Sequence, residues 1–120
     1  MEWSLWFLGA LVILAWIALK RSLSVPESVA HRLLAEGAVV VDVRSPAEFA
    51  QDHVEGAVNV PLGEIAQHIA QAVPDRRTPV LAYCQGGGRS AIASHRMRAL
   101  GYERVYNLGS LGRAKSLVRQ

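Results

Sequence analysis

The chain has 120 residues and a mass of 13.1 kDa, which is the size of one small domain and excludes a two-domain enzyme. Hydrophobic residues make up 51% of the chain, and the formal net charge is +3. The single cysteine, Cys84, excludes an intramolecular disulfide, and with four scattered histidines it excludes a cysteine-rich zinc site. We therefore expect no metal and no other cofactor.

The N-terminal segment differs in composition from the rest of the chain. Residues 3–19 contain no charged side chain, and as a helix they would be about 26 Å long, close to the ~30 Å hydrocarbon core of a bilayer. Trp3, Trp6 and Trp16 lie toward the two ends of the segment, where indole rings favour the headgroup region. We predict one transmembrane helix, with residues 1–21 as a membrane anchor and residues 22–120 as a separate domain.

Two alternatives to an anchor are a cleaved signal peptide and a buried core helix. A signal peptide begins with Lys or Arg and ends in a small-x-small site, whereas this segment begins Met-Glu-Trp and ends Ala-Leu-Lys-Arg-Ser. A domain of about 99 residues is too small to enclose a helix that is apolar all round. Because Lys20 and Arg21 follow the segment, the positive-inside rule predicts a cytoplasmic domain, or a periplasmic one if the segment is a signal peptide.

Helical and strand patterns alternate in residues 22–120. Residues 26–36 predict a helix with Pro26 in its first turn and Gly37 after its end. Residues 38–43 are a β-branched run typical of a strand buried on both faces. Further along we predict a short helix at 46–51, a strand at 57–60, a helix at 65–73, a strand at 80–83, a helix at 90–100, a strand at 104–107 and a truncated final helix. This alternation predicts an α/β domain with an open, mainly parallel sheet flanked by helices.

Charge is distributed unevenly along this domain. Residues 22–75 carry two basic and eight acidic side chains, and residues 76–120 carry nine basic and one acidic. A basic field raises the local concentration of small anions; the alternative is a basic face that contacts anionic lipid headgroups. We do not expect a nucleic-acid partner, because no aromatic platform or basic recognition helix accompanies the charge.

A glycine-rich loop follows Cys84, which stands at the carboxyl end of a predicted strand, where ligands bind in open α/β sheets. Gly86, Gly87 and Gly88 allow consecutive N–H groups to point at one centre, and the next helix adds its positive N-terminus. Such surroundings lower a cysteine pKa from ~8.5 to ~3.5–7.5, so we predict that Cys84 is a nucleophile. The alternative, a buried and inert cysteine, is disfavoured by the three glycines and Arg89 that follow it.

Four segments carry a resemblance to a known family: residues 42–49 (DVRSPAEF), 53–62 (HVEGAVNVPL), 84–90 (CQGGGRS) and 101–109 (GYERVYNLG). They resemble, in the same order, the short single-domain type of the rhodanese family of sulfurtransferases. The likeness spans about residues 24–112. It implies that Cys84 takes sulfane sulfur from a small anionic donor such as thiosulfate, holds it as a persulfide and passes it to cyanide or a thiol.

The resemblance also implies roles for other residues. The loop residues Gln85, Gly86, Gly87, Gly88 and Arg89 would bind the substrate, with their backbone amides around the persulfide and with Arg89 orienting an anionic donor. Another three residues would give structural support rather than catalysis: Asp42, Arg44 and His53.

Two other functions remain open at this point. Cysteine phosphatases and arsenate reductases have an active-site loop of the pattern C-x5-R, in which the five residues between Cys and Arg form a ring wide enough for a tetrahedral oxyanion. Only four residues separate Cys84 from Arg89, and this tighter loop favours a single sulfur atom. The other alternative is a non-catalytic, membrane-tethered interaction module, which would need neither Cys84 nor Arg89.

Overall fold

The computed structural model describes residues 2–119, and for residues 20–23 it describes the backbone alone. The elements in chain order are α1 (Glu2–Leu23), α2 (Glu27–Ala35), β1 (Val39–Asp42), α3 (Pro46–Gln51), β2 (Val58–Asn59), a 3-10 turn (Leu62–Glu64), α4 (Ile65–Ala72), β3 (Val80–Cys84), α5 (Gly88–Ala99), β4 (Val105–Ser110) and α6 (Leu111–Val118).

The strands form one parallel sheet in the order β2-β1-β3-β4. Of its two central strands, β1 is valine-rich and β3 is buried along its whole length, as expected for strands covered on both faces. All carboxyl ends of parallel strands lie at one edge of the sheet, and Cys84 ends β3 there. The predicted α/β fold with a parallel sheet flanked by helices is confirmed.

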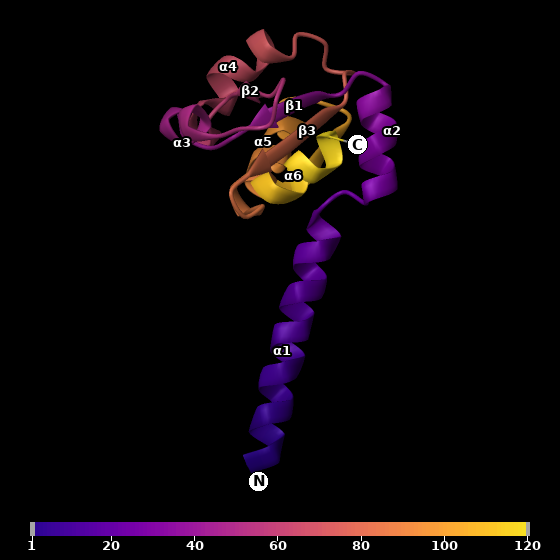
Figure 1. Ribbon diagram of the computed structural model, residues 1–120, viewed down its shortest axis with the longest axis vertical. Coiled ribbons are helices and arrows are strands. Elements are labelled where there is room, and N and C mark those ends of the chain that lie inside the picture. Colours follow the sequence, from indigo (N-terminus) through magenta and orange to yellow (C-terminus); the bar gives the residue numbers. More distant parts are fainter. Residues whose placement is uncertain (1, 120) are drawn as a thin grey trace.

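Two helical layers cover the sheet, with α4 and α5 on one face and α2 and α6 on the other (Figure 1). Side chains alternate between the two cores along β3, because successive residues of a strand point to opposite faces. Cys84 belongs to the core on the α4 and α5 side, whereas Tyr83 belongs to the core on the α2 and α6 side. This alternation directs the sulfur of Cys84 toward α5.

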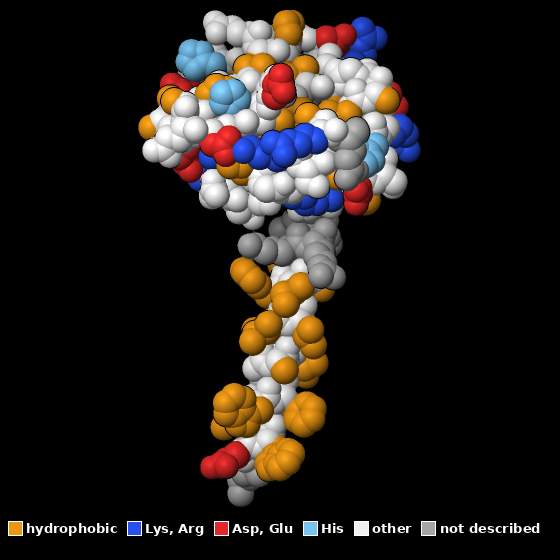
Figure 2. Space-filling view, viewed as in Figure 1, with side chains coloured by type: hydrophobic (Ala, Val, Ile, Leu, Met, Phe, Trp, Pro, Cys, Tyr) orange, Lys and Arg blue, Asp and Glu red, His pale blue; other side chains and the backbone are white. Residues whose placement is uncertain are grey.

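Helix α1 projects from this domain as a separate rod (Figure 1). Figure 2 shows apolar side chains around the rod, and Trp3 and Trp6 are about four-fifths exposed (79% and 80%). Within the part of the chain that the structure describes, residues 2–19 are the one stretch of helix long and apolar enough to cross a membrane, a test that signal sequences also pass. The side chains of Lys20 and Arg21, on which the predicted orientation rests, lie outside the described residues.

Most predicted boundaries agree with the structure to within one residue; for example, β3 continues to Cys84 where the prediction ended it at residue 83. Three elements differ from the prediction by two residues or more, in length or at one end. The edge strand β2 has two residues instead of four, because only Val58 and Asn59 are in register with β1. Strand β4 continues to Ser110 instead of ending at residue 107, because its pairing with β3 resumes after a bulge. At the bulge, Leu108 is an extra residue between the partners of Ala82 and Tyr83, and Gly109 adopts a φ of +101°. Helix α5 begins at Gly88, two residues before the predicted start.

Candidate active site

Cys84 lies beneath the loop that connects β3 to α5. Its residue is 1% exposed, and its Sγ accepts a hydrogen bond from the backbone N–H of Gly87 at a distance of 2.9 Å. The hydroxyl of Ser90, in the first turn of α5, lies 3.5 Å from the same sulfur. The sulfur is therefore in contact with two polar groups although it is buried.

These polar groups change the acidity of the thiol. Burial raises the pKa of Cys84, but hydrogen bonds from the Ser90 hydroxyl and from the backbone amides of Ser90, Gly87 and Gly86 lower it by more. The net pKa lies below that of an ordinary thiol, because hydrogen bonds to a thiolate stabilise the charged form. The backbone amides that lower the pKa of Cys84 belong to residues 86, 87 and 90. The sequence predicted the amides of residues 85–89 for this role.

Gly87 determines the shape of the loop. It has a φ of +96° and occupies the position before the first turn of α5, a backbone conformation that favours glycine. Because the chain reverses at Gly87, Gly88 and Arg89 lie in the first turn of the helix and not in the loop. A Cβ added at Gly86 or Gly88 would meet no atom within 4 Å, so no side chain covers the loop at those two positions.

Arg89 lies beside this loop and pairs with Glu48 on α3. The guanidinium makes two hydrogen bonds to the carboxylate, at 2.7 and 3.0 Å. Glu48 also accepts from the backbone N–H of Ser45 and, together with the Ser45 side chain, caps α3. The hydrogen bonds from Arg89 and then Ser45 lower the pKa of Glu48 to about 2, so Glu48 is a carboxylate at neutral pH.

Sequence reasoning did not identify Glu48 as a site residue. The available signal was the spacing Ser45-Pro46-Ala47-Glu48, which is a helix capping box. That pattern predicts the start of α3 and contains no information on the contact with Arg89, which is 41 positions away.

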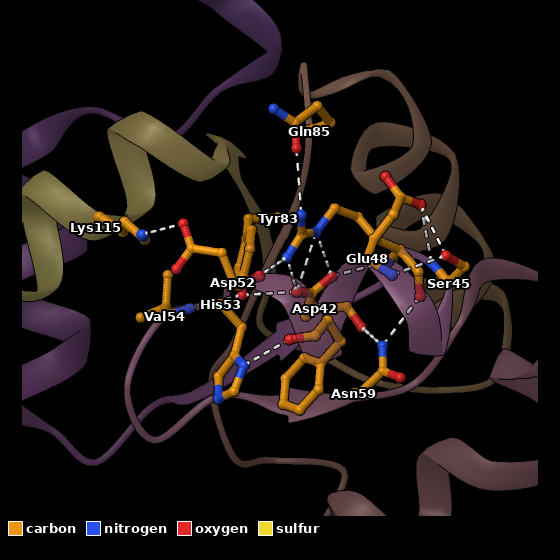
Figure 3. Close-up of polar contacts among 12 residues, drawn as sticks. Asp42, Ser45, Glu48, Asp52, His53, Val54, Asn59, Tyr83, Gln85 and Lys115 are labelled. Atoms are coloured by element: carbon orange, nitrogen blue, oxygen red, sulfur yellow. Dashed lines mark hydrogen bonds and ion pairs between the residues drawn. The ribbon is translucent and has the colours of Figure 1, made fainter.

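Asp42 and Arg44 form a buried ion pair on the opposite face of the sheet, with exposed fractions of 0% and 3% and a nitrogen–oxygen distance of 2.7 Å. Figure 3 shows that the hydroxyl of Tyr83 points at the same carboxylate, to which it donates at 2.8 Å. Burial, with the hydrogen bond to Asp42, raises the pKa of Tyr83 to about 12. Nη1 of the same Arg44 guanidinium donates to Oε1 of Gln85 at 3.2 Å, so this cluster reaches the residue after Cys84.

His53 lies outside this ion pair. Its ring stacks on Phe49 at a centroid distance of 3.8 Å, and its Nδ1 lies 2.7 Å from the Phe49 carbonyl (Figure 3). The side chain is exposed and lies in the segment that follows α3. His68 and His95 are exposed, and the described residues contain no group of three or more acidic, His or Cys side chains that would hold a metal ion.

A cavity of about 770 Å³ adjoins the outer side of the loop. One wall is the glycine run 86–88, the second is the end of β4 with Asn107 and Gly109, and the third is the segment 24–26 together with Arg113. Arg113 holds that segment in place, because its guanidinium donates to the carbonyls of Leu108 and Val25. Cys84 does not line the cavity, so its sulfur lies behind the loop backbone as seen from there.

A comparison with known protein families agrees with the geometry of the loop around Cys84. Residues 25–111, which include both ion pairs and the loop, match the rhodanese-like domain family. The chain belongs to the rhodanese family. The family match begins after α1, which lies outside the matched residues.

Individual rhodaneses are similar in sequence and in structure. The thiosulfate sulfurtransferase PspE of Escherichia coli is 44% identical over 71 residues, which are 59% of this chain and 68% of the relative. A solved rhodanese with anions from E. coli is 41% identical with a TM-score of 0.61, over 63% of this chain and 89% of that one. The human single-domain sulfurtransferase TSTD1 is 30% identical with a TM-score of 0.65, over 82% and 97%.

The rhodanese domain and its kinship with thiosulfate sulfurtransferases support a function in sulfur transfer. Cys84 is the only cysteine in the chain and is therefore the candidate site for a persulfide.

Proposed function

We propose that this protein is a membrane-tethered thiosulfate sulfurtransferase in which Cys84 carries the transferred sulfur as a persulfide. The observation that carries the proposal is the 2.9 Å hydrogen bond from Gly87 N–H to Sγ, together with the lowered pKa of Cys84. A thiolate, and not a thiol, attacks sulfur. The loop therefore supplies the reactive form of Cys84 without a general base or a metal ion.

In the first half-reaction the Cys84 thiolate attacks the outer sulfur of thiosulfate. A new S–S bond forms, the bond between the two donor sulfurs breaks with its electron pair, and sulfite leaves. In the second half-reaction cyanide or a thiolate attacks the terminal sulfur of the persulfide. Thiocyanate or a new persulfide is released, and the electron pair returns to Sγ, which is again a thiolate.

In this proposal the donor and the persulfide are bound by Gln85, Gly86 and Gly87 of the loop together with Gly88 and Arg89 of the first turn of α5. Three observations support these roles: the amides that contact Sγ, the positive end of α5, and the position of Arg89 in its first turn. The structural residues Asp42, Arg44 and His53 hold the neighbouring segments, because the first two form a buried pair and the third packs on Phe49.

The activity is tested by incubating the full chain, in mild detergent, with thiosulfate and cyanide. We expect thiocyanate from the wild type and none from Cys84→Ser. We also expect that intact-mass measurement after donor treatment finds one added sulfur atom on the wild type only. Absence of both thiocyanate and the added mass would refute sulfur transfer, and hydrolysis of an aryl phosphate instead would favour the phosphatase alternative.

We further propose that residues 1–21 anchor residues 22–120 to a membrane, with the rhodanese domain in the cytoplasm. Support comes from the exposure of the apolar side chains along α1 and from its length. A carbonate wash of membranes from expressing cells, followed by intact mass, tests this. An anchor stays in the washed membrane at the full mass, whereas a signal peptide yields a shorter, released chain. Protease treatment of vesicles of known orientation then determines which side the domain occupies.

A further inference from the structure

Asn107 is a buried polar residue close to the loop that the sequence did not single out. It lies on β4 opposite Ala82, on the α5 side of the sheet, and is 5% exposed. Its Oδ1 accepts from the hydroxyl of Ser90 at 2.6 Å and from the backbone N–H of Gly109 at 3.0 Å, and its Nδ2 donates to the carbonyl of Gly87 at 3.1 Å. These contacts fix the orientation of the amide, because a flipped amide would place its N–H groups against the N–H of Gly109.

The Ser90 hydroxyl has a single proton and three acceptors within reach. The distances from its Oγ are 2.6 Å to Asn107 Oδ1, 3.1 Å to the Gly87 carbonyl and 3.5 Å to Cys84 Sγ. A hydroxyl donates to one acceptor at a time, and the shortest of these contacts is to Asn107. The bond to Asn107 therefore competes directly with the bond to the sulfur.

The balance of this competition depends on the charge of the sulfur. A hydrogen bond to an ionised acceptor is roughly twice as strong as a neutral one, so a thiolate draws the Ser90 proton more strongly than a thiol does. In the sulfur-transfer cycle, Sγ is charged before attack on the donor. It becomes uncharged in the persulfide, whose negative charge is on the terminal sulfur, and it is charged again after transfer.

We propose that Asn107 is a positioning residue that holds the Ser90 hydroxyl away from Cys84 while Sγ is uncharged and releases it toward Sγ when the thiolate forms. The change is a rotation of the hydroxyl about its Cβ–Oγ bond, and the proton stays on Ser90 throughout. The hydrogen bond to Sγ is thus present when the sulfur carries charge and absent when it does not. The competition for the Ser90 proton is argued from the contacts alone, and only its timing in the reaction cycle rests on the proposed function.

The charged groups around this triad are paired or held by backbone carbonyls in this structure. Arg89, on α5, is the charged side chain that interacts with Cys84, and Glu48 on α3 neutralises it. Arg113, on α6, is held by the carbonyls of Leu108 and Val25. On the other face of the sheet, Asp42 on β1 and Arg44 after it form a buried ion pair.

The test is the pH dependence of Cys84 alkylation by iodoacetamide, measured on the full chain in detergent. Ser90→Ala removes the hydroxyl, so the midpoint of the profile moves to higher pH. Asn107→Ala removes the nearer of the two competing acceptors and leaves the Gly87 carbonyl, so the midpoint moves to lower pH and the rate below the midpoint rises about two- to tenfold. In the double variant, Asn107→Ala has no further effect, because the hydroxyl through which it acts is gone.

Two more variants complete the test. Asn107→Asp keeps an acceptor for the Ser90 hydroxyl, but it adds a negative charge and removes the Nδ2 donor to the Gly87 carbonyl. It therefore moves the midpoint to higher pH, by more with the Ser90 hydroxyl present than in Ser90→Ala, and it replaces Asn107→Ala in the test if that variant fails to fold. Tyr102→Phe is the matched control: it removes a buried hydroxyl that donates to the Val73 carbonyl at 2.6 Å, and we expect an unchanged profile.

A shift of Asn107→Ala toward higher pH, or an equal shift with and without Ser90, overturns the proposal. If Asn107→Ala does not fold, an Asn107→Asp shift of the same size with and without the Ser90 hydroxyl overturns it. Alkylation does not require sulfur transfer, so the proposed activity and this inference fail in separate experiments.

Discussion

Arg89 and Glu48 form an ion pair with two hydrogen bonds, although the two side chains keep exposed fractions of 40% and 33%. The pair joins the first turn of α5 to α3 at the edge of the glycine loop. An anionic donor that binds Arg89 therefore competes with the Glu48 carboxylate for the same guanidinium.

Glu48→Gln is expected to strengthen donor binding. Glutamine retains the side-chain contact of the capping box, so α3 is kept while the charge that opposes the donor is removed. We expect the KM for thiosulfate to fall about two- to tenfold with little change in kcat, as for a partly exposed ion pair. Steady-state thiocyanate formation measures both constants. Glu103→Gln, an exposed carboxylate after the end of α5, is the control, and a raised KM in Glu48→Gln would contradict the competition.

Gly87→Ala is expected to reduce both stability and activity. A side chain at a φ of +96° is strained, and its Cβ would lie 3.5 Å from the Cα of Gly109. We expect a loss of about 1–2 kcal/mol in the free energy of unfolding and at least a tenfold loss of kcat, because relief of the strain turns the N–H away from Sγ. Gly37→Ala is the matched control: Gly37 has a φ of +91° but lies after α2, so only stability falls. Equal activity in the two variants would show that the Gly87 N–H does not matter.

The lowered pKa of Cys84 predicts a pH-dependent contribution to stability. A thiolate favoured by the fold contributes fully above the unfolded thiol's pKa of ~8.5, and the contribution is lost as pH falls through the lower folded pKa. We expect the difference in unfolding free energy between wild type and Cys84→Ala to increase from the folded pKa up to that value. Urea unfolding at a series of pH values measures it. A difference that stays constant with pH would mean that the fold does not favour the thiolate.

Asp42→Asn is expected to destabilise the domain strongly. It leaves the Arg44 guanidinium, 3% exposed, without its carboxylate, and breaking a buried pair costs about 3–5 kcal/mol. Asp75→Asn is the control, because Asp75 pairs with Arg77 at the surface with exposed fractions of 56% and 79%; we expect a change within about 0.5 kcal/mol. Urea unfolding followed by circular dichroism compares the two variants. Similar losses in both would mean that burial of the Asp42 pair is unimportant.

Much of the fold was predictable because it depends on local patterns. The valine run of β1, Pro46 at the start of α3 and Gly101 after α5 each signal an element boundary or a buried strand without reference to the rest of the chain. The predicted bounds were wrong where the length of a strand depends on how it pairs with a neighbouring strand. Strand β2 is short because β1 pairs with only two of its residues, and β4 is long because a bulge accommodates Leu108.

The candidate site likewise has features that local sequence predicts and features that depend on contacts between distant residues. The local sequence predicts that Cys84 ends a strand, that a glycine run follows it and that a positive helix end is near, because these features lie within residues 80–90. The contacts of Glu48 with Arg89 and of Asn107 with Ser90 could not be predicted from the sequence and are seen in the folded chain. These contacts join positions 41 and 17 residues apart, and their side chains meet because parallel strands bring the ends of separate elements to one edge of the sheet.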